Sequence, residues 1–383
     1  MSTEWLIFAV AAGAGGSWYS LRRRDAGRWE RAAAVALPVL LVALVYVYRE
    51  TALLNTRWPW SACRLAAVFG WVHGYPLYSP IDHGPINGWL YGPVAAIAWL
   101  PATLAASPQS ALMVAALINL GFLLIPLHCV ARQSMPQSRL GAGLLFVAGA
   151  AALPQLYPTW YMASALNVDA IAVGLGTGSC LLLLRRDTGN SRLVLAALLG
   201  VLAVWTKQVE APLVVAQCGW LWFCRDRRAA LTFVLAYGGF MAAIAGAVFS
   251  LLSVRDVIFN LWTVPSHHAF IGGWRAAWGE LADLSKYGLP LWAPCLVALV
   301  IAARGKKNEC NEPAPAEGTA LLFLAALVLL PTGIMATIKM GGDRNSLHSV
   351  YYLLAAALGA LGGRWLPEFP RRNEWLAGAL LTI

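Results

Sequence analysis

Ionisable side chains that could support group-transfer chemistry gather in a few short segments of an otherwise apolar chain. A carboxylate in such a segment can take the proton from an attacking hydroxyl group. Cationic side chains can hold a phosphate and stabilise it as a leaving group. The candidates for the base are Asp82, Glu50 and Asp169. The candidates for binding phosphate or substrate are Lys207, Arg344, His267, His83, Tyr78, Tyr91 and Asn345.

Residues 73–93 form the densest of these segments, with the sequence "HGYPLYSPIDHGPINGWLYGP". Its prolines stiffen the chain, and a stiff segment holds reacting groups without reorganisation. Asp82 is the acid of the surrounding loop that is remote from the ends of apolar runs, so it can face a cavity. We therefore expect this stretch to form the floor of the site, with His83 beside Asp82. The alternative is that Asp82 only stabilises a turn.

Structural roles compete with the chemical ones at the other positions as well. Asp169 could cap the helix that follows it, and Lys207 could extend its ammonium group toward the membrane surface. His267 could be an ordinary loop residue. Tyrosines near the ends of membrane spans commonly belong to an interfacial belt. The argument for a site is that acids, cations and histidines occur together in these segments.

The elements that must position these residues are membrane helices. The chain of 383 residues is 59% hydrophobic and 12% charged, whereas soluble domains carry about a quarter charged residues. Its apolar runs approach the length of a membrane span and must be helical. We expect an all-α polytopic membrane protein of about eleven or twelve transmembrane helices, forming a single transmembrane domain over residues 1–383. The chain ends within an apolar run, which suggests that a C-terminal part is missing.

The net charge of +10 reflects topology and not a nucleic-acid partner. Most Arg and Lys residues lie in six links: residues 22–31, 132–139, 185–192, 225–228, 304–307 and 364–372. The positive-inside rule makes these links cytoplasmic. Residues 49–110 then form a long first outer loop and residues 253–289 a late outer loop. An apolar helix within residues 89–106 cannot cross the membrane fully, because a crossing would invert every later link. Residues 61–72 fit an interfacial helix.

No motif indicates a metal or another cofactor. The seven cysteines are scattered, and no pair or Cys/His cluster has the spacing of metal ligands. We expect neither a metal nor any cofactor to be required.

Isolated carboxylates and several cations beside lipid are typical of a site for a substrate with an anionic headgroup and a hydrophobic tail, such as a polyprenyl-phosphate sugar. Aromatic rings would supply faces for the sugar and the prenyl chain. A transporter would instead place polar residues at the bilayer midplane, where this sequence is almost wholly apolar. A flippase of lipid-linked glycans and a catalytically inactive membrane scaffold remain open as alternatives.

Four motifs occur in order along nearly the whole chain. They are "GYPLY" with "YGP" in the first outer loop (residues 74–78 and 91–93), Asp169 opening a later span, "KQ" at 207–208, and "GGDRN" at 341–345. In these motifs the sequence resembles the GT-C superfamily of integral membrane glycosyltransferases, in the group of polyprenyl-phosphate-dependent mannosyl-, arabinosyl- and RgtA/B/C/D-like transferases.

The resemblance implies transfer of a sugar from a polyprenyl-phosphate donor to a hydroxyl of a glycan, lipid or protein acceptor. It also implies an active site on the periplasmic face of a bacterial inner membrane. Enzymes of this kind usually carry an acid upstream of the "GYPLY" element, but residues 55–65, "NTRWPWSACRL", contain none. Glu50, Asp82 or Asp169 must then serve as the base, or the chain is inactive.

Overall fold

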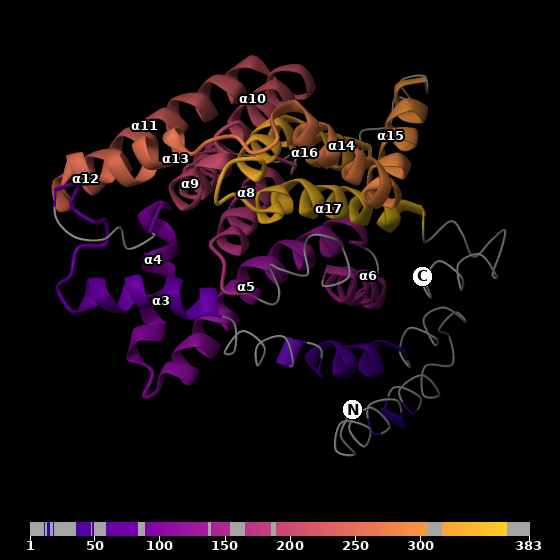
Figure 1. Ribbon diagram of the computed structural model, residues 1–383. Coiled ribbons are helices and arrows are strands. Elements are labelled where there is room, and N and C mark those ends of the chain that lie inside the picture. Colours follow the sequence, from indigo (N-terminus) through magenta and orange to yellow (C-terminus); the bar gives the residue numbers. More distant parts are fainter. Residues whose placement is uncertain are drawn as a thin grey trace.

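The computed structural model describes residues 36–46, 48–49, 59–82, 89–136, 139–153, 165–184, 189–304 and 316–365, together with residues 11, 14, 15 and 18 (Figure 1). Within these residues the chain is built from helices, apart from an isolated β-bridge between Phe270 and Lys339. The predicted all-α fold class is therefore confirmed.

The helices follow one another in three groups along the chain. The first group is α3 (Pro59–Val72), α4 (Pro93–Trp99), η1 (Leu100–Leu104), α5 (Pro108–Ser134) and α6 (Arg139–Ala152). The second is α8 (Asp169–Leu183), α9 (Asn190–Thr206), η3 (Gln208–Glu210), α10 (Leu213–Cys224) and α11 (Arg227–Leu251). The third is α12 (Val254–Ile258), η4 (Phe259–Thr263), α13 (Val264–His267), α14 (Gly273–Tyr287), α15 (Leu289–Arg304), α16 (Ala316–Thr337), η5 (Arg344–Leu347) and α17 (His348–Trp365).

Three helices of the described part, α5, α11 and α16, are long and apolar enough to cross a membrane. At about 1.5 Å per residue, the 27 residues of α5 and the 25 of α11 exceed a hydrocarbon core of about 30 Å. Shorter apolar helices of 10–17 residues accompany them. The membrane character is confirmed, while the total of about eleven or twelve spans stays a prediction.

Helix α11 presents an apolar surface to its surroundings. Ala230, Phe233 and Val248 are its buried residues, whereas Leu231 and Leu235 are exposed. A helix satisfies its own backbone hydrogen bonds, so a long helix with an exposed apolar face is stable in lipid. Helix α11 therefore faces the hydrocarbon.

The apolar helix expected within residues 89–106 is short, since α4 and η1 together run only from Pro93 to Leu104. At about 1.5–2 Å per residue this segment is shorter than the membrane core. Gly92, just before it, packs on the end of α9: a Cβ atom there would lie 1.6 Å from the carbonyl oxygen of Trp205. The N–H of Gly92 also donates to the carbonyl of Thr206 at 3.2 Å. Glycine thus allows direct backbone contact between the first loop and α9.

The basic link 225–228 and the two candidate loops lie at opposite ends of α11. Arg225 donates to the carbonyl oxygen of Leu183, at the C-terminal end of α8, at 3.1 Å. Beyond the other end of α11, Arg255 and Asp256 contact residues 81 and 82 of the first loop. The basic link 225–228 and the two loops therefore lie at opposite ends of α11, as the positive-inside rule predicted.

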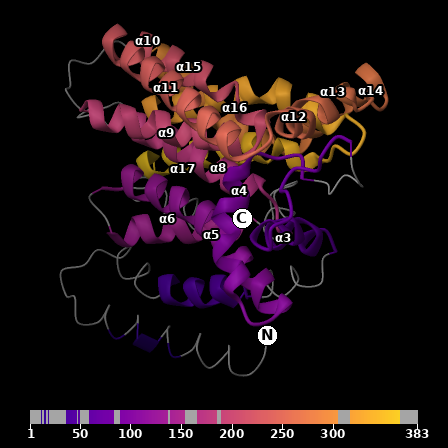
Figure 2. The ribbon, with the colours of Figure 1, turned by 90° about the vertical axis from the view of Figure 1, so that its left-hand side faces the viewer.

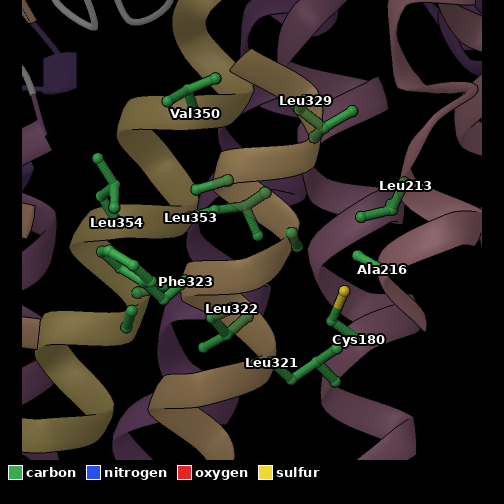
Figure 3. Packing of buried hydrophobic residues seen from close by; sticks show 14 of the residues in the cluster. Cys180, Leu213, Ala216, Leu321, Leu322, Phe323, Leu329, Val350, Leu353 and Leu354 are labelled. Carbon is green, nitrogen blue, oxygen red and sulfur yellow. The ribbon is translucent and has the colours of Figure 1, made fainter. Parts of the chain in front are cut away.

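The core forms around α8, whose residues are nearly all buried. Helices α5, α9, α10, α16 and α17 pack around it. Gly174 of α8 permits a close approach to α5, because a Cβ atom there would lie 2.3 Å from the carbonyl oxygen of Phe122. Figure 3 shows the apolar layer between these helices, with Cys180, Leu213, Ala216, Leu321, Leu322, Phe323, Leu329, Val350, Leu353 and Leu354. This packing holds the C-terminal half of α8, while Val168 and Ile171 at its start pack in a second apolar cluster.

Helices α3, α12, α13 and α14 all lie toward the right in Figure 2, although α12 and α14 are well separated in Figure 1. The N–H of Ile271 donates to the carbonyl of Ile338, and the N–H of Met340 donates to that of Ala269, both at 2.7 Å. These bonds join the segment before α14 to the end of α16. The late loop at residues 253–289 is largely helical, because it contains α12, η4, α13 and α14. Helix α3 covers the residues of the expected interfacial helix.

Candidate active site

Asp169, Lys207 and Asn345 meet in the interior from three different elements. Asp169 is the first residue of α8, Lys207 follows the last residue of α9, and Asn345 lies in η5. The Lys207 ammonium forms an ion pair with Oδ1 of Asp169, and Asn345 Nδ2 donates to Oδ2 at 3.0 Å. The exposed fractions of the Lys207 and Asp169 side chains are 8% and 1%. Both carboxylate oxygens are therefore satisfied away from water.

Local structure explains why a buried carboxylate is tolerated here. The N-terminus of α8 places the positive end of its dipole beside Asp169. Lys207 adopts extended backbone angles, φ −146° and ψ 124°, which end α9. Because a buried charge without a partner is costly, loss of either Lys207 or Asp169 would destabilise the fold.

Glu210 and Ser349 extend the cluster on the side of Lys207. Glu210 is 1% exposed in the link between α9 and α10, and the Ser349 hydroxyl donates to its Oε1. Burial raises the pKa of Glu210 to about 7; the Ser349 hydrogen bond and Lys207 oppose the rise, and Asp169 adds to it. One ammonium group thus faces two carboxyl groups, and protonation of Glu210 removes the excess negative charge.

The segment before Asp169 is held by side chains from α3 and α5. The N–H of Leu166 donates to Oγ of Ser61 at 2.9 Å, and Arg64 donates to the Leu166 carbonyl at 2.8 Å. Asn119 Nδ2 donates to the carbonyl of Asn167 at 2.8 Å. These bonds fix the direction in which α8 begins.

Gln208 links the cluster to both loops. Its Nε2 donates to the carbonyl oxygens of Leu90 and Leu261, each at 3.2 Å. Leu90 belongs to the first loop and Leu261 to η4 of the late loop. The residue next to Lys207 therefore holds the two loops together.

A second contact between the loops includes Asp82. Arg255 binds its carboxylate with two nitrogens, Nη1 to Oδ2 at 2.6 Å and Nη2 to Oδ1 at 3.2 Å. The exposed fractions of the Arg255 and Asp82 side chains are 65% and 56%. Nearby, the Ile81 N–H donates to Oδ1 of Asp256 at 3.2 Å, and Asn260 donates to the Ser79 carbonyl at 3.0 Å. Asp82 is thus an exposed acid in a paired contact between loops.

Comparisons with known proteins bear on this arrangement. No family model matches the chain. Over 93 residues it is 24% identical to a UPF0324 membrane protein of Shewanella oneidensis, covering 24% of this chain and 29% of that protein. The crystal structure of ArnT from Cupriavidus metallidurans in the apo state superposes with a TM-score of 0.56 and 18% identity, covering 83% of this chain. The chain shares the fold of ArnT. It spans 59% of the length of ArnT.

The motifs quoted for the GT-C resemblance lie close together in this fold. Tyr78 donates its hydroxyl hydrogen to the carbonyl of Tyr91 at 2.8 Å, which joins the two halves of the first-loop motif. Gly92 packs on α9 next to Lys207. Asp169, Lys207 and Asn345 contact one another directly. Motifs far apart in sequence therefore converge on one end of α8 and α9.

Two cationic candidates have partners of their own. Arg344 binds Glu280 of α14 at 3.2 Å and Asp283 at 2.6 Å. The exposed His267 has Nδ1 at 2.8 Å from the carbonyl oxygen of Thr263. Arg344 nevertheless precedes Asn345, so η5 connects the buried cluster to α14.

Glu50 and His83 lie outside the described residues, so their roles stay predictions. The roles of Asp82, Asp169, Lys207, Arg344, His267, Tyr78, Tyr91 and Asn345 also stay predictions, although their positions are now known. Among the described residues, no group of three or more His, Cys, Asp and Glu side chains could hold a metal ion.

The candidate site residues chosen from the sequence did not include Glu210 or Ser349. Glu210 follows Lys207 by three residues in the link between α9 and α10, and this spacing could have drawn attention to it. Ser349 has no comparable signal, because its role depends on how α17 packs against that link.

Proposed function

We propose that this protein is a glycosyltransferase that moves a sugar from a polyprenyl-phosphate donor to an acceptor hydroxyl on the outer, periplasmic face of a bacterial inner membrane. The fold is that of membrane glycosyltransferases. The observation that carries the proposal is the buried Asp169–Lys207 pair where α8, α9 and η5 meet. It offers a cation and a carboxylate that are held together in the protein interior.

In the proposed reaction, the acceptor oxygen attacks the anomeric carbon of the sugar. The bond between that carbon and the phosphate oxygen breaks, and its electron pair leaves with the polyprenyl phosphate. Lys207 would hold the phosphate and stabilise the departing charge. Arg344 would assist if the donor phosphate displaced Glu280 or Asp283 from it.

The proton of the acceptor hydroxyl would pass to a carboxylate. Asp82 is the first candidate, because it is exposed and reachable from outside the bundle. Its oxygens face Arg255, so the acceptor would have to enter this contact. Asp169 is the second candidate, and it already lies beside the proposed phosphate ligand. Tyr78 and Tyr91 would support the sugar through the first loop, whose two motif halves they join.

The test is to incubate purified protein in lipid nanodiscs with a panel of radiolabelled polyprenyl-phosphate sugars and candidate acceptors. Loss of the donor with formation of a glycosylated acceptor is the expected result. Lys207→Ala should reduce donor affinity and turnover. Arg228→Ala is the matched control, because it removes an exposed cation from the opposite end of α11.

Three results would count against the proposal. Movement of a lipid-linked glycan across a vesicle membrane without bond cleavage would indicate a flippase. Absence of both turnover and donor binding across the panel would indicate an inactive scaffold. Unchanged donor affinity in the Lys207 variant would place the phosphate site elsewhere.

A further inference from the structure

Helix α14 has two different faces. On its inner side Ala277 is buried, and Leu281 and Leu284 pack against the main core. Its acids Glu280 and Asp283 also turn inward, to Arg344 of η5. The helix is therefore seated on the bundle through one apolar stripe and two ion pairs.

Beside this inner side, α14 carries large exposed aromatic rings. Trp274 is 83% exposed and Trp278 is 68% exposed. Their spacing of four residues places both rings on one face of the helix. Phe270 and Ile271, just before α14, are exposed as well. Such a patch is unfavourable in water, so it indicates a surface that is covered.

The charges of α14 are divided between its inner and outer sides. Arg275 and Lys286 are exposed, whereas Glu280 and Asp283 are engaged with Arg344. The outer surface thus combines tryptophan rings with positive charge. An anionic phospholipid layer has the complementary chemistry: phosphate groups for the cations, and an acyl boundary for the rings.

The aromatic patch also continues into membrane-facing surface. Helix α15 begins two residues after α14 ends, and its residues Leu289, Val297 and Val300 are exposed. Helix α15 is one of the apolar helices of the described part. Because α15 follows α14 directly, α14 lies at the start of an apolar helix.

We propose that α14 lies in the headgroup layer and binds anionic phospholipids through its outer face. Trp274 and Trp278 enter the acyl boundary, while Arg275 and Lys286 meet headgroup phosphates. The inner face stays on η5, so lipid contact and the Asn345–Asp169 bond are connected through one short turn. This proposal does not depend on sugar transfer.

The test uses the full chain with p-benzoylphenylalanine in place of Trp278. The protein is irradiated in nanodiscs of phosphatidylcholine containing a minor fraction of phosphatidylglycerol, and adducts are identified by mass spectrometry. We expect phospholipid adducts with phosphatidylglycerol enriched about fivefold over its share of the bilayer. Arg275→Gln with Lys286→Gln should remove the enrichment and leave the cross-linking to lipid.

The matched control places the same photoreactive residue at Leu117, an exposed position of α5. Its adducts should follow the composition of the bilayer, because α5 carries no Lys or Arg before Arg132. Absence of lipid adducts at position 278 would overturn the proposal, as would an adduct with a protein partner. Enrichment that persists in the double glutamine variant would also overturn it.

Discussion

Lys207 neutralises Asp169 within the bundle, and this pairing predicts a strong dependence of stability on both residues. Lys207→Met keeps most of the side-chain volume but leaves a buried carboxylate unpaired. We expect the free energy of unfolding to fall by about 3–5 kcal/mol. Adding Asp169→Asn should restore part of the loss, because the uncompensated charge is then gone. Thermal unfolding in detergent micelles would measure both effects, and an unchanged midpoint for Lys207→Met would contradict the buried pair.

Glu210 predicts a second, pH-dependent effect at the residue scale. Its folded pKa is raised to about 7, so between about pH 4.5 and that value the folded state binds more protons than the unfolded chain. Stability from this group is therefore greatest at low pH and falls as the pH rises through this window. Glu210→Gln should flatten the change in melting temperature. Asp226→Asn, an exposed acid that caps α11, is the control and should retain the wild-type slope.

At the scale of elements, Gly92 predicts a packing requirement between the first loop and α9. Gly92→Ala would place a Cβ atom against the Trp205 carbonyl oxygen, so the backbone must move. We expect a loss of about 1–3 kcal/mol and weaker donor binding, because Lys207 lies just beyond this contact. Gly121→Ala in α5 is the matched control, since no heavy atom lies within 4 Å of its added Cβ. Equal melting temperatures for the two variants would contradict the close approach.

The contact between the two loops predicts that Asp82 can be tested without damage to the fold. The Asp82 and Arg255 side chains are both more than half exposed, and exposed ion pairs contribute about 0–1 kcal/mol. Asp82→Asn should therefore leave the melting temperature nearly unchanged. If Asp82 is the base, turnover should be lost while donor affinity is retained. Normal turnover in this variant, with Asp169→Asn inactive, would assign the base role to Asp169.

Sequence patterns predicted elements better than they predicted contacts. Apolar runs and arginine links indicated membrane helices, because a helix that crosses lipid needs predominantly apolar side chains along its whole length. The sequence could not show that Arg344 binds two acids of α14, or that Ser349 reaches Glu210, because these contacts depend on helix packing. Asp82 was favoured for its distance from span ends, and that position alone could not reveal its bond to Arg255.

For the whole molecule, the opposite ends of α11 predict opposite sides of the membrane. Asp82 contacts the segment beyond the C-terminus of α11, while Asp226 caps its N-terminus. Single cysteines at these positions, in a chain without its native cysteines, should differ in labelling by an impermeant maleimide. The cysteine at position 82 should react in intact cells, and that at position 226 only after permeabilisation. Labelling of both from the same side would contradict the topology.

The shortness of α8 sets the depth of the buried pair. Its 15 residues rise about 22 Å, whereas the 25 residues of α11 rise about 37 Å. Both helices have an end near Arg225, so Asp169 lies fewer ångströms along its helix from that end than the C-terminus of α11 does. Under the proposed function, a lipid carrier whose headgroup reaches this pair would have to sink toward the hydrocarbon, or the bilayer would have to thin around the protein. Membrane thickness would then enter the free energy of donor binding.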